Sequence, residues 1–169
     1  KPFFDSGLRP VRVLFRAFFH RIKEPFSLGI ARFSDKADVA LLRFDQRGIK
    51  LPLLSLDSSP KAATVGGPVI LIGYPAGIEA LLARVDPATL RKIIDIRGRN
   101  TNEIAQELSQ HGLIRPLTTW GHLSDVQPHQ LTYDALTTAG GSGSPIFNLQ
   151  GKVIGINQAI LENFPGSNF

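Results

Sequence analysis

The chain of 169 residues contains no cysteine and no methionine. Without cysteine it can form no disulfide framework, no thiolate metal site and no thiol nucleophile. It also lacks a run of about 18 apolar residues, the length that a membrane-spanning helix needs, and it lacks a charged-then-apolar signal segment at its start. We therefore expect no membrane span in this segment and no chemistry based on sulfur.

The excess of positive over negative charge is also small. The net charge is only +5, and the 19 basic residues are scattered along the chain instead of forming a stripe. Because nucleic-acid-binding proteins carry a concentrated basic patch, we expect no nucleic-acid partner. The hydrophobic fraction of 43% is ordinary for a globular protein, and the 16 glycines and 12 prolines between short apolar runs favour a turn-rich β architecture.

Two kinds of local pattern follow each other along the chain. Short β-branched and aromatic runs predict strands at 11–19, 28–33, 38–44, 68–75, 117–125, 130–136 and 152–160. Between them, Asp86 followed by Pro87 predicts a helix start, Asn100 followed by Glu103 predicts a second, and Gly112 is a typical helix stop. The pattern predicts two helices inserted into a β protein.

The segment 138–147, Thr-Ala-Gly-Gly-Ser-Gly-Ser-Pro-Ile-Phe, has the composition of a nucleophile loop. A serine that attacks a carbonyl carbon must be exposed on a tight turn, and the oxyanion that develops needs fixed N–H donors about 3 Å away. Gly140, Gly141 and Gly143 suit both needs, because glycine accepts positive φ and lets the backbone approach a ligand. Ser142 is therefore the candidate nucleophile.

Several ordered motifs resemble the trypsin-like serine peptidases, especially the cysteine-free bacterial HtrA/Deg-type branch. The G-x-S-G-S-P pattern is followed by an apolar strand, a turn at Gln150-Gly151 and the sequence Val-Ile-Gly-Ile-Asn. Further segments match this family in order: Asp38-Val39-Ala40-Leu41-Leu42, residues 66–77, residues 119–124 and residues 132–135. The resemblance covers most of residues 28–160 outside the helical insert.

The resemblance implies an all-β fold with a chymotrypsin-type double β-barrel. Residues 1–54 would form an incomplete N-terminal barrel and residues 55–60 a linker. Residues 61–169 would form the second barrel, with a helical insert at about 80–116. Both ends look cut, so we expect the sequence to be a segment of a longer protein.

The resemblance also implies site roles for an endopeptidase that needs no metal and no cofactor. Ser142 would be the nucleophile and Asp38 the acid that orients a histidine. The backbone N–H groups of Gly140 and Ser142 would form the oxyanion hole, with that of Gly141 close by. The alternative for Asp38 is a turn residue at a strand start.

The expected partner is a polypeptide substrate. Leu136 matches the floor of the primary specificity pocket, and a leucine there would make the pocket apolar, favouring cleavage after small or medium aliphatic residues. Residues that match the substrate-pairing strand would bind an extended peptide by strand addition. These residues are Asn157, Gln158, Ala159 and Ile160.

The catalytic base is missing from its expected place. In this family the histidine lies some thirty or more residues before the aspartate, which would place it at or before residue 8, and residues 1–10 contain none. His20 lies too close to Asp38, and the other three histidines follow it: His111, His122 and His129. We expect the base to lie upstream of Lys1. The alternative is a catalytically inactive relative that binds peptides or proteins.

The remaining polar residues near these motifs have simpler interpretations. Asp35 and Asp45 are typical turn caps, and Asp134 and Ser144 are expected to be structural. An α/β-hydrolase elbow would need G-x-S-x-G, and Ser144 occupies the place of its final glycine. The sequence leaves open the oligomeric state and the location, which could be extracytoplasmic (periplasmic or secreted) or bacterial cytoplasmic.

Overall fold

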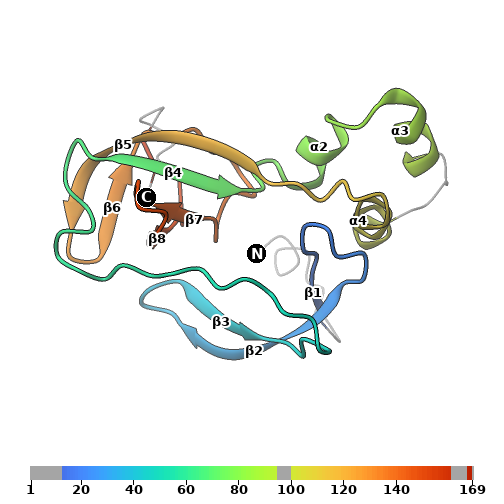
Figure 1. The fold of residues 1–169 in the computed structure, drawn as a ribbon, viewed down its shortest axis with the longest axis horizontal. Helices are drawn as coiled ribbons and strands as arrows, with labels where there is room; N and C mark the ends of the chain where they lie inside the picture. Colours follow the sequence, from blue (N-terminus) through green and yellow to red (C-terminus); the bar gives the residue numbers. More distant parts are fainter. Residues whose placement is uncertain (1–12, 95–99, 161–166, 169) are drawn as a thin grey trace, which may run out of the picture.

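The structure, a computed structural model, describes residues 13–94, 100–160 and 167–168. It contains two antiparallel sheets and a group of helices at one end of the larger sheet (Figure 1). The smaller sheet has the order β1-β2-β3. Its strands are β1 (Phe15–Ala17), β2 (Phe26–Ser34) and β3 (Val39–Arg43). The strand predicted at 11–19 is described only from residue 13 onward, and only its central part forms β1.

The larger sheet has five strands in the order β6-β5-β4-β7-β8. They are β4 (Pro68–Gly73), β5 (Leu117–Gln127), β6 (Gln130–Tyr133), β7 (Pro145–Phe147) and β8 (Val153–Ile156). Alternate residues of β4 face the core, so Val69 and Leu71 are almost fully buried. They pack with Leu123, Tyr133 and Ile146, which makes this sheet the main core of the molecule.

The described residues of the helical insert form three helices instead of the two that the sequence predicted. They are α2 (Gly77–Leu82), α3 (Pro87–Ile94) and α4 (Thr101–Gln110). The N-terminal signals of α3 and α4 are confirmed: Asp86 Oδ1 accepts the Thr89 N–H at 3.0 Å, and Asn100 forms a capping box with Glu103. The sequence did not indicate α2, because this helix is short and begins after Ala76 without a side-chain cap.

The insert has its own apolar core and also contacts the smaller sheet's flanking segment. Ile93 and Leu108 are completely buried in this core. Ser109 Oγ donates to the Ile22 carbonyl at 2.8 Å, and His20 Nδ1 lies 2.8 Å from the Ile114 carbonyl oxygen. The insert thus connects the two β units, as the position of α4 above β1 in Figure 1 illustrates.

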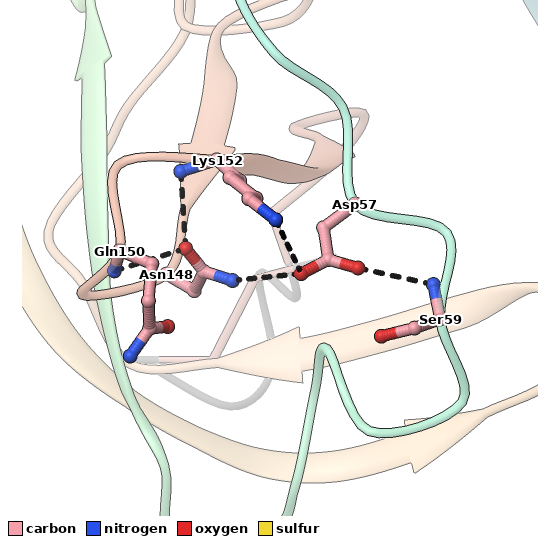
Figure 2. Close-up of polar contacts among 5 residues, drawn as sticks. All are labelled: Asp57, Ser59, Asn148, Gln150 and Lys152. Atoms are coloured by element: carbon pink, nitrogen blue, oxygen red, sulfur yellow. Dashed lines mark hydrogen bonds and ion pairs between the residues drawn. The ribbon is translucent and has the colours of Figure 1, made fainter.

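The segment predicted as a linker, residues 55–60, is held against the edge of β8. The Asp57 N–H donates to the Val153 carbonyl at 2.9 Å, and the Val153 N–H donates to the Ser55 carbonyl at 2.8 Å. The Asp57 carboxylate also accepts the Ser59 N–H and lies 4.0 Å from Lys152 Nζ (Figure 2). The hydrogen bonds to Ser59 are the main cause that lowers the pKa of Asp57.

Figure 2 also shows how Asn148 closes the turn before β8. Its Oδ1 accepts the backbone N–H groups of Gln150 at 3.1 Å and Lys152 at 3.0 Å, and its Nδ2 donates to Asp57 at 3.5 Å. The mostly β architecture with its helical insert confirms the predicted fold class. No helix in the described ranges is both long and apolar enough to cross a membrane.

Candidate active site

Ser142 lies exposed in the loop between β6 and β7, and its hydroxyl donates to the Gln158 carbonyl at 2.9 Å. Two backbone hydrogen bonds hold the loop to the segment after β8. The Gly143 N–H donates to the Asn157 carbonyl at 2.7 Å, and the Asn157 N–H donates to the Ser144 carbonyl at 2.8 Å. The nucleophile candidate is therefore presented on a turn that is fixed directly after it.

The loop conformation explains its glycines. Gly140 and Gly143 both have φ of +87°, which side chains rarely tolerate. Gly141 has no such φ, but a Cβ on it would lie 2.2 Å from Thr137 Oγ1. The sequence pattern of small residues therefore reflects both backbone conformation and close packing.

The N–H groups of this loop divide into used and unused donors. The Gly141 N–H donates to the Thr138 carbonyl at 3.0 Å, and the Ser144 N–H donates to the Gly141 carbonyl at 3.1 Å. In the described parts of the chain, the N–H groups of Gly140 and Ser142 have no protein acceptor. Of the three expected oxyanion-hole residues, two thus keep a free donor, while the Gly141 N–H closes the turn.

A buried hydrogen bond that the sequence did not reveal holds Asn157, whose backbone binds the serine loop. The Tyr133 hydroxyl donates to Asn157 Oδ1, and both side chains are almost fully buried. Burial raises the pKa of Tyr133 above its usual value. Because the side chain of Asn157 faces Tyr133 and its backbone binds the serine loop, every observed partner of Asn157 is internal.

Ser144 is packed against β4. A Cβ on Gly73 would lie 1.8 Å from Ser144 Oγ, so the last residue of β4 leaves room for the serine side chain. Asp134 is also engaged by backbone, since its Oδ1 accepts the His122 N–H at 2.6 Å. Both observations agree with the structural roles expected for Ser144 and Asp134.

The residues expected to bind substrate differ in exposure. The side chain of Leu136 is 76% exposed, while its carbonyl accepts the Thr119 hydroxyl at 2.8 Å. Gln158 is exposed, Ala159 is half-buried, and Ile160 forms an antiparallel bridge with Asn168. Leu136 and Gln158 therefore both lie at the surface. In the sequence, Leu136 precedes the serine loop and Gln158 follows it.

No triad is assembled from the described residues. Asp38 is exposed in the turn between β2 and β3, with φ of +48°, and no hydrogen bond or ion pair of its side chain is found in the described ranges. β3 begins at Val39, one residue after the predicted strand start. The structure thus gives no contact between Asp38 and Ser142.

None of the four histidines hydrogen-bonds to Ser142. His20 contacts the Ile114 carbonyl, His111 lies 3.9 Å from the Glu107 carboxylate, and the ring of His122 lies edge-on to Trp120. His129 is exposed in the turn between β5 and β6. A base for Ser142 is therefore absent among the described residues.

Comparisons with known proteins point to a family of peptidases. Residues 10–156 match the family described as the trypsin-like peptidase domain. The chain is 27% identical over 143 residues to "Probable periplasmic serine endoprotease DegP-like" of Chlamydia trachomatis, an alignment that covers 85% of this chain and 23% of that protein. A protein of the same name from Ectopseudomonas mendocina is 30% identical over 131 residues, covering 78% of this chain and 21% of that protein.

A human relative is similar over a comparable length. The chain is 28% identical over 131 residues to "Serine protease FAM111B" of Homo sapiens, with 73% of this chain and 17% of that protein covered. The chain thus spans less than a quarter of the length of these three relatives.

Proposed function

The chain belongs to the trypsin-like peptidase family, as an HtrA/Deg-like member, and has its chymotrypsin-type β fold. From this premise we propose that the protein is a serine endopeptidase that hydrolyses peptide bonds through an acyl-serine intermediate on Ser142. One observation carries the proposal: an exposed serine hydroxyl lies on a turn in which the N–H groups of Gly140 and Ser142 have no acceptor among the described residues.

The two free N–H groups provide the electrostatic part of the mechanism. When Ser142 Oγ attacks the scissile carbonyl carbon, the carbonyl oxygen gains negative charge, which the donors of Gly140 and Ser142 would stabilise. Loss of one such donor typically raises the barrier by about 3–4 kcal/mol. The adjacent Gly141 N–H would contribute little, because it already donates to Thr138.

Activation of the serine requires a base that removes the hydroxyl proton, and the Gln158 carbonyl cannot do this. The Ser142 hydroxyl donates its hydrogen bond to that carbonyl, so attack requires the hydroxyl to rotate toward a stronger acceptor. We propose that a histidine upstream of Lys1 is this base and that Asp38 orients it. None of the four histidines of the chain hydrogen-bonds to Ser142, so a peptidase mechanism requires a base from outside this segment.

The proposed substrate is an extended polypeptide with an aliphatic residue before the scissile bond. Leu136 would provide an apolar floor for the pocket that takes this side chain, and its exposure leaves it free to do so. The backbone of Gln158, Ala159 and Ile160 would pair with the substrate strand. Asn157 would act indirectly, because its side chain accepts the Tyr133 hydroxyl and its backbone binds the serine loop.

Peptide hydrolysis by the full-length protein tests this proposal. Matched peptides that differ only in the residue before the scissile bond should be cleaved faster with valine or leucine than with lysine or aspartate at that place. Leu136→Asp should lower kcat/KM for the aliphatic peptides and spare the thermal stability, because the side chain is exposed. Equal cleavage of all four peptides would contradict the proposal of an apolar pocket. No cleavage of any peptide would contradict the proposal that the protein is a peptidase.

A second candidate is a catalytically inactive peptide-binding module with the same fold. It is favoured by the exposed Asp38, which hydrogen-bonds to no described residue, and by the lack of a hydrogen bond between Ser142 and any of the four histidines. Such a module would bind an extended peptide along residues 158–160 without cleaving it. Calorimetric binding of an aliphatic peptide that remains intact after long incubation would select this candidate over the peptidase.

A further inference from the structure

The proposed catalytic groups lie on two different β units. Asp38 lies in the turn between β2 and β3 of the smaller sheet, whereas Ser142 precedes β7 of the larger sheet. A base that Asp38 orients must come within hydrogen-bond distance of the Ser142 hydroxyl, about 3 Å. The relative placement of the two units therefore decides whether the proposed site can be assembled.

The helical insert carries the hydrogen bonds that join these two units. Among the described residues, every hydrogen bond between residues 13–54 and residues 61–168 runs between the insert and the loop at 18–24, which connects β1 to β2. We call this contact the brace. Phe18 of the same loop packs against the buried core of the insert. The smaller unit is thus attached to the larger one at the brace, in addition to the linker that binds β8.

Ser109 is a buried member of the brace. It is only 4% exposed in the last turn of α4, and its hydroxyl donates to the Ile22 carbonyl at 2.8 Å. A serine inside a helix commonly bonds the carbonyl four residues earlier in its own helix. The Ser109 hydroxyl instead donates to a different segment, so it contributes to the contact between the units and not to α4 itself.

Two further hydrogen bonds extend the brace. The Gln110 side chain donates to the Lys23 carbonyl at 3.4 Å, and His20 Nδ1 donates to the Ile114 carbonyl at 2.8 Å. Three of the acceptors in the brace are backbone carbonyls, which have fixed positions in the loop and in the insert. The brace therefore defines a place for the smaller unit and does not merely hold it near.

The insert is rooted at the end of the larger sheet that contacts the serine loop. β4 leads into the insert and β5 leads out of it, and these strands stay paired up to Gly73 and Leu117, their residues next to the insert. Gly73 also lies against Ser144, two residues after Ser142. The insert is therefore fixed relative to the serine loop through two paired strands.

We infer that the brace sets the position of the smaller unit relative to Ser142, and that Ser109 is a positioning residue for the proposed reaction; this inference rests on the proposed function. The linker alone would leave the smaller unit free to turn about its contact with β8. The brace supplies a second attachment at α4, away from β8 (Figure 1). Because a misplacement of about 1 Å can cost about a hundredfold in rate, a small turn of this unit would slow the reaction.

Weakening the brace should lower kcat without a comparable change in KM. The groups proposed to bind substrate, Leu136 and residues 158–160, all belong to the larger unit, whereas Asp38 belongs to the smaller one. A displaced smaller unit thus misplaces the base and leaves the substrate contacts in place. An interaction that is needed only for the chemical step changes kcat and leaves KM nearly constant.

The test compares two substitutions in and beside α4 in the full-length protein. Ser109→Ala removes the hydroxyl and keeps a good helix former. It should lower kcat about three- to tenfold, less than a misplacement of 1 Å would, because the other hydrogen bonds of the brace remain. The matched control, Asn100→Ala, removes the capping box at the opposite end of α4 and leaves the brace intact. It should keep kcat within about twofold of the parent.

Spin labels on the two units give a readout that does not need activity. Lys36 and Gln150 are exposed, in the turn between β2 and β3 and in the turn between β7 and β8. A keto-bearing amino acid at each position takes the label regardless of any cysteines elsewhere in the full-length protein. Pulsed electron double resonance should give one narrow distance distribution in the parent and in Asn100→Ala, and a broader one in Ser109→Ala.

Three results would overturn the inference. They are an unchanged kcat in Ser109→Ala, equal losses of kcat in Ser109→Ala and Asn100→Ala, and a distance distribution in Ser109→Ala that matches the parent. A different result separates the inference from the proposed function. If the parent hydrolyses no peptide while the distribution broadens in Ser109→Ala, the proposed function is refuted and the brace itself is upheld.

Discussion

Gly73 to alanine is the substitution whose consequence the structure defines most sharply. The added Cβ would lie 1.8 Å from Ser144 Oγ, 2.6 Å from Ser144 Cβ and 3.7 Å from Ser144 Cα. The first two distances are far inside ordinary contact, while the third is an ordinary van der Waals separation. The clash therefore comes from one side chain. We expect Gly73→Ala to destabilise the protein by about 1–3 kcal/mol, the usual range for overpacking.

Removal of the clashing side chain should rescue the protein. Ser144→Gly deletes Oγ and Cβ but keeps the Ser144 N–H and carbonyl, which bind Gly141 and Asn157. This single substitution should cost about 0.5–1 kcal/mol through backbone entropy. The free energies of unfolding of the double variant and of Ser144→Gly should agree within about 0.5 kcal/mol. The effects of the two substitutions should therefore be strongly non-additive.

Urea unfolding of the four proteins, followed by circular dichroism and tryptophan fluorescence, measures these differences. Gly73→Ala should also shift the backbone resonances of the serine loop, since Ser144 can escape the clash only by moving. Parent-like stability of Gly73→Ala, or additive losses in the double variant, would refute the packing argument.

Further predictions concern the two cores. Tyr133→Phe should cost about 1–3 kcal/mol by urea unfolding, because it leaves Asn157 Oδ1 buried without its donor. Burial raises the pKa of Tyr133 in the folded state, so the parent should lose stability as the pH rises above about 10, the ordinary tyrosine pKa. Melting curves of Tyr133→Phe should lack this Tyr133 contribution to the loss of stability at high pH. The same pH dependence in both proteins would contradict the prediction. Leu108→Ala should cost about 2–5 kcal/mol, because Leu108 is fully buried in the insert. A loss below 1 kcal/mol would argue against a fixed insert core.

Local signals predicted most of the elements correctly. A short β-branched apolar run identified β4, and side-chain caps identified α3 and α4, because these signals lie within a few neighbouring residues. The pattern around Ser142 correctly indicated positive φ at Gly140, which depends on the absence of a side chain. The family prediction was confirmed by the match over residues 10–156.

Contacts between distant segments could not be predicted in the same way. Nothing near Tyr133 indicates that its hydroxyl binds Asn157, and nothing near Ala76 indicates a bond to Ala139. The left-handed Ala76 also hid α2, since glycine or a capping side chain usually marks such a position. Tertiary packing imposes these features, and a single sequence records only their local component.

The central claim is that Ser142 is the nucleophile. The most direct measurement is covalent labelling of the folded full-length protein with a fluorophosphonate, read by mass spectrometry of the digested protein. Our account predicts one label, on Ser142, that Ser142→Ala abolishes and Ser144→Ala retains. A folded protein that takes no label, or a label that persists in Ser142→Ala, would contradict the assignment of Ser142 as the nucleophile.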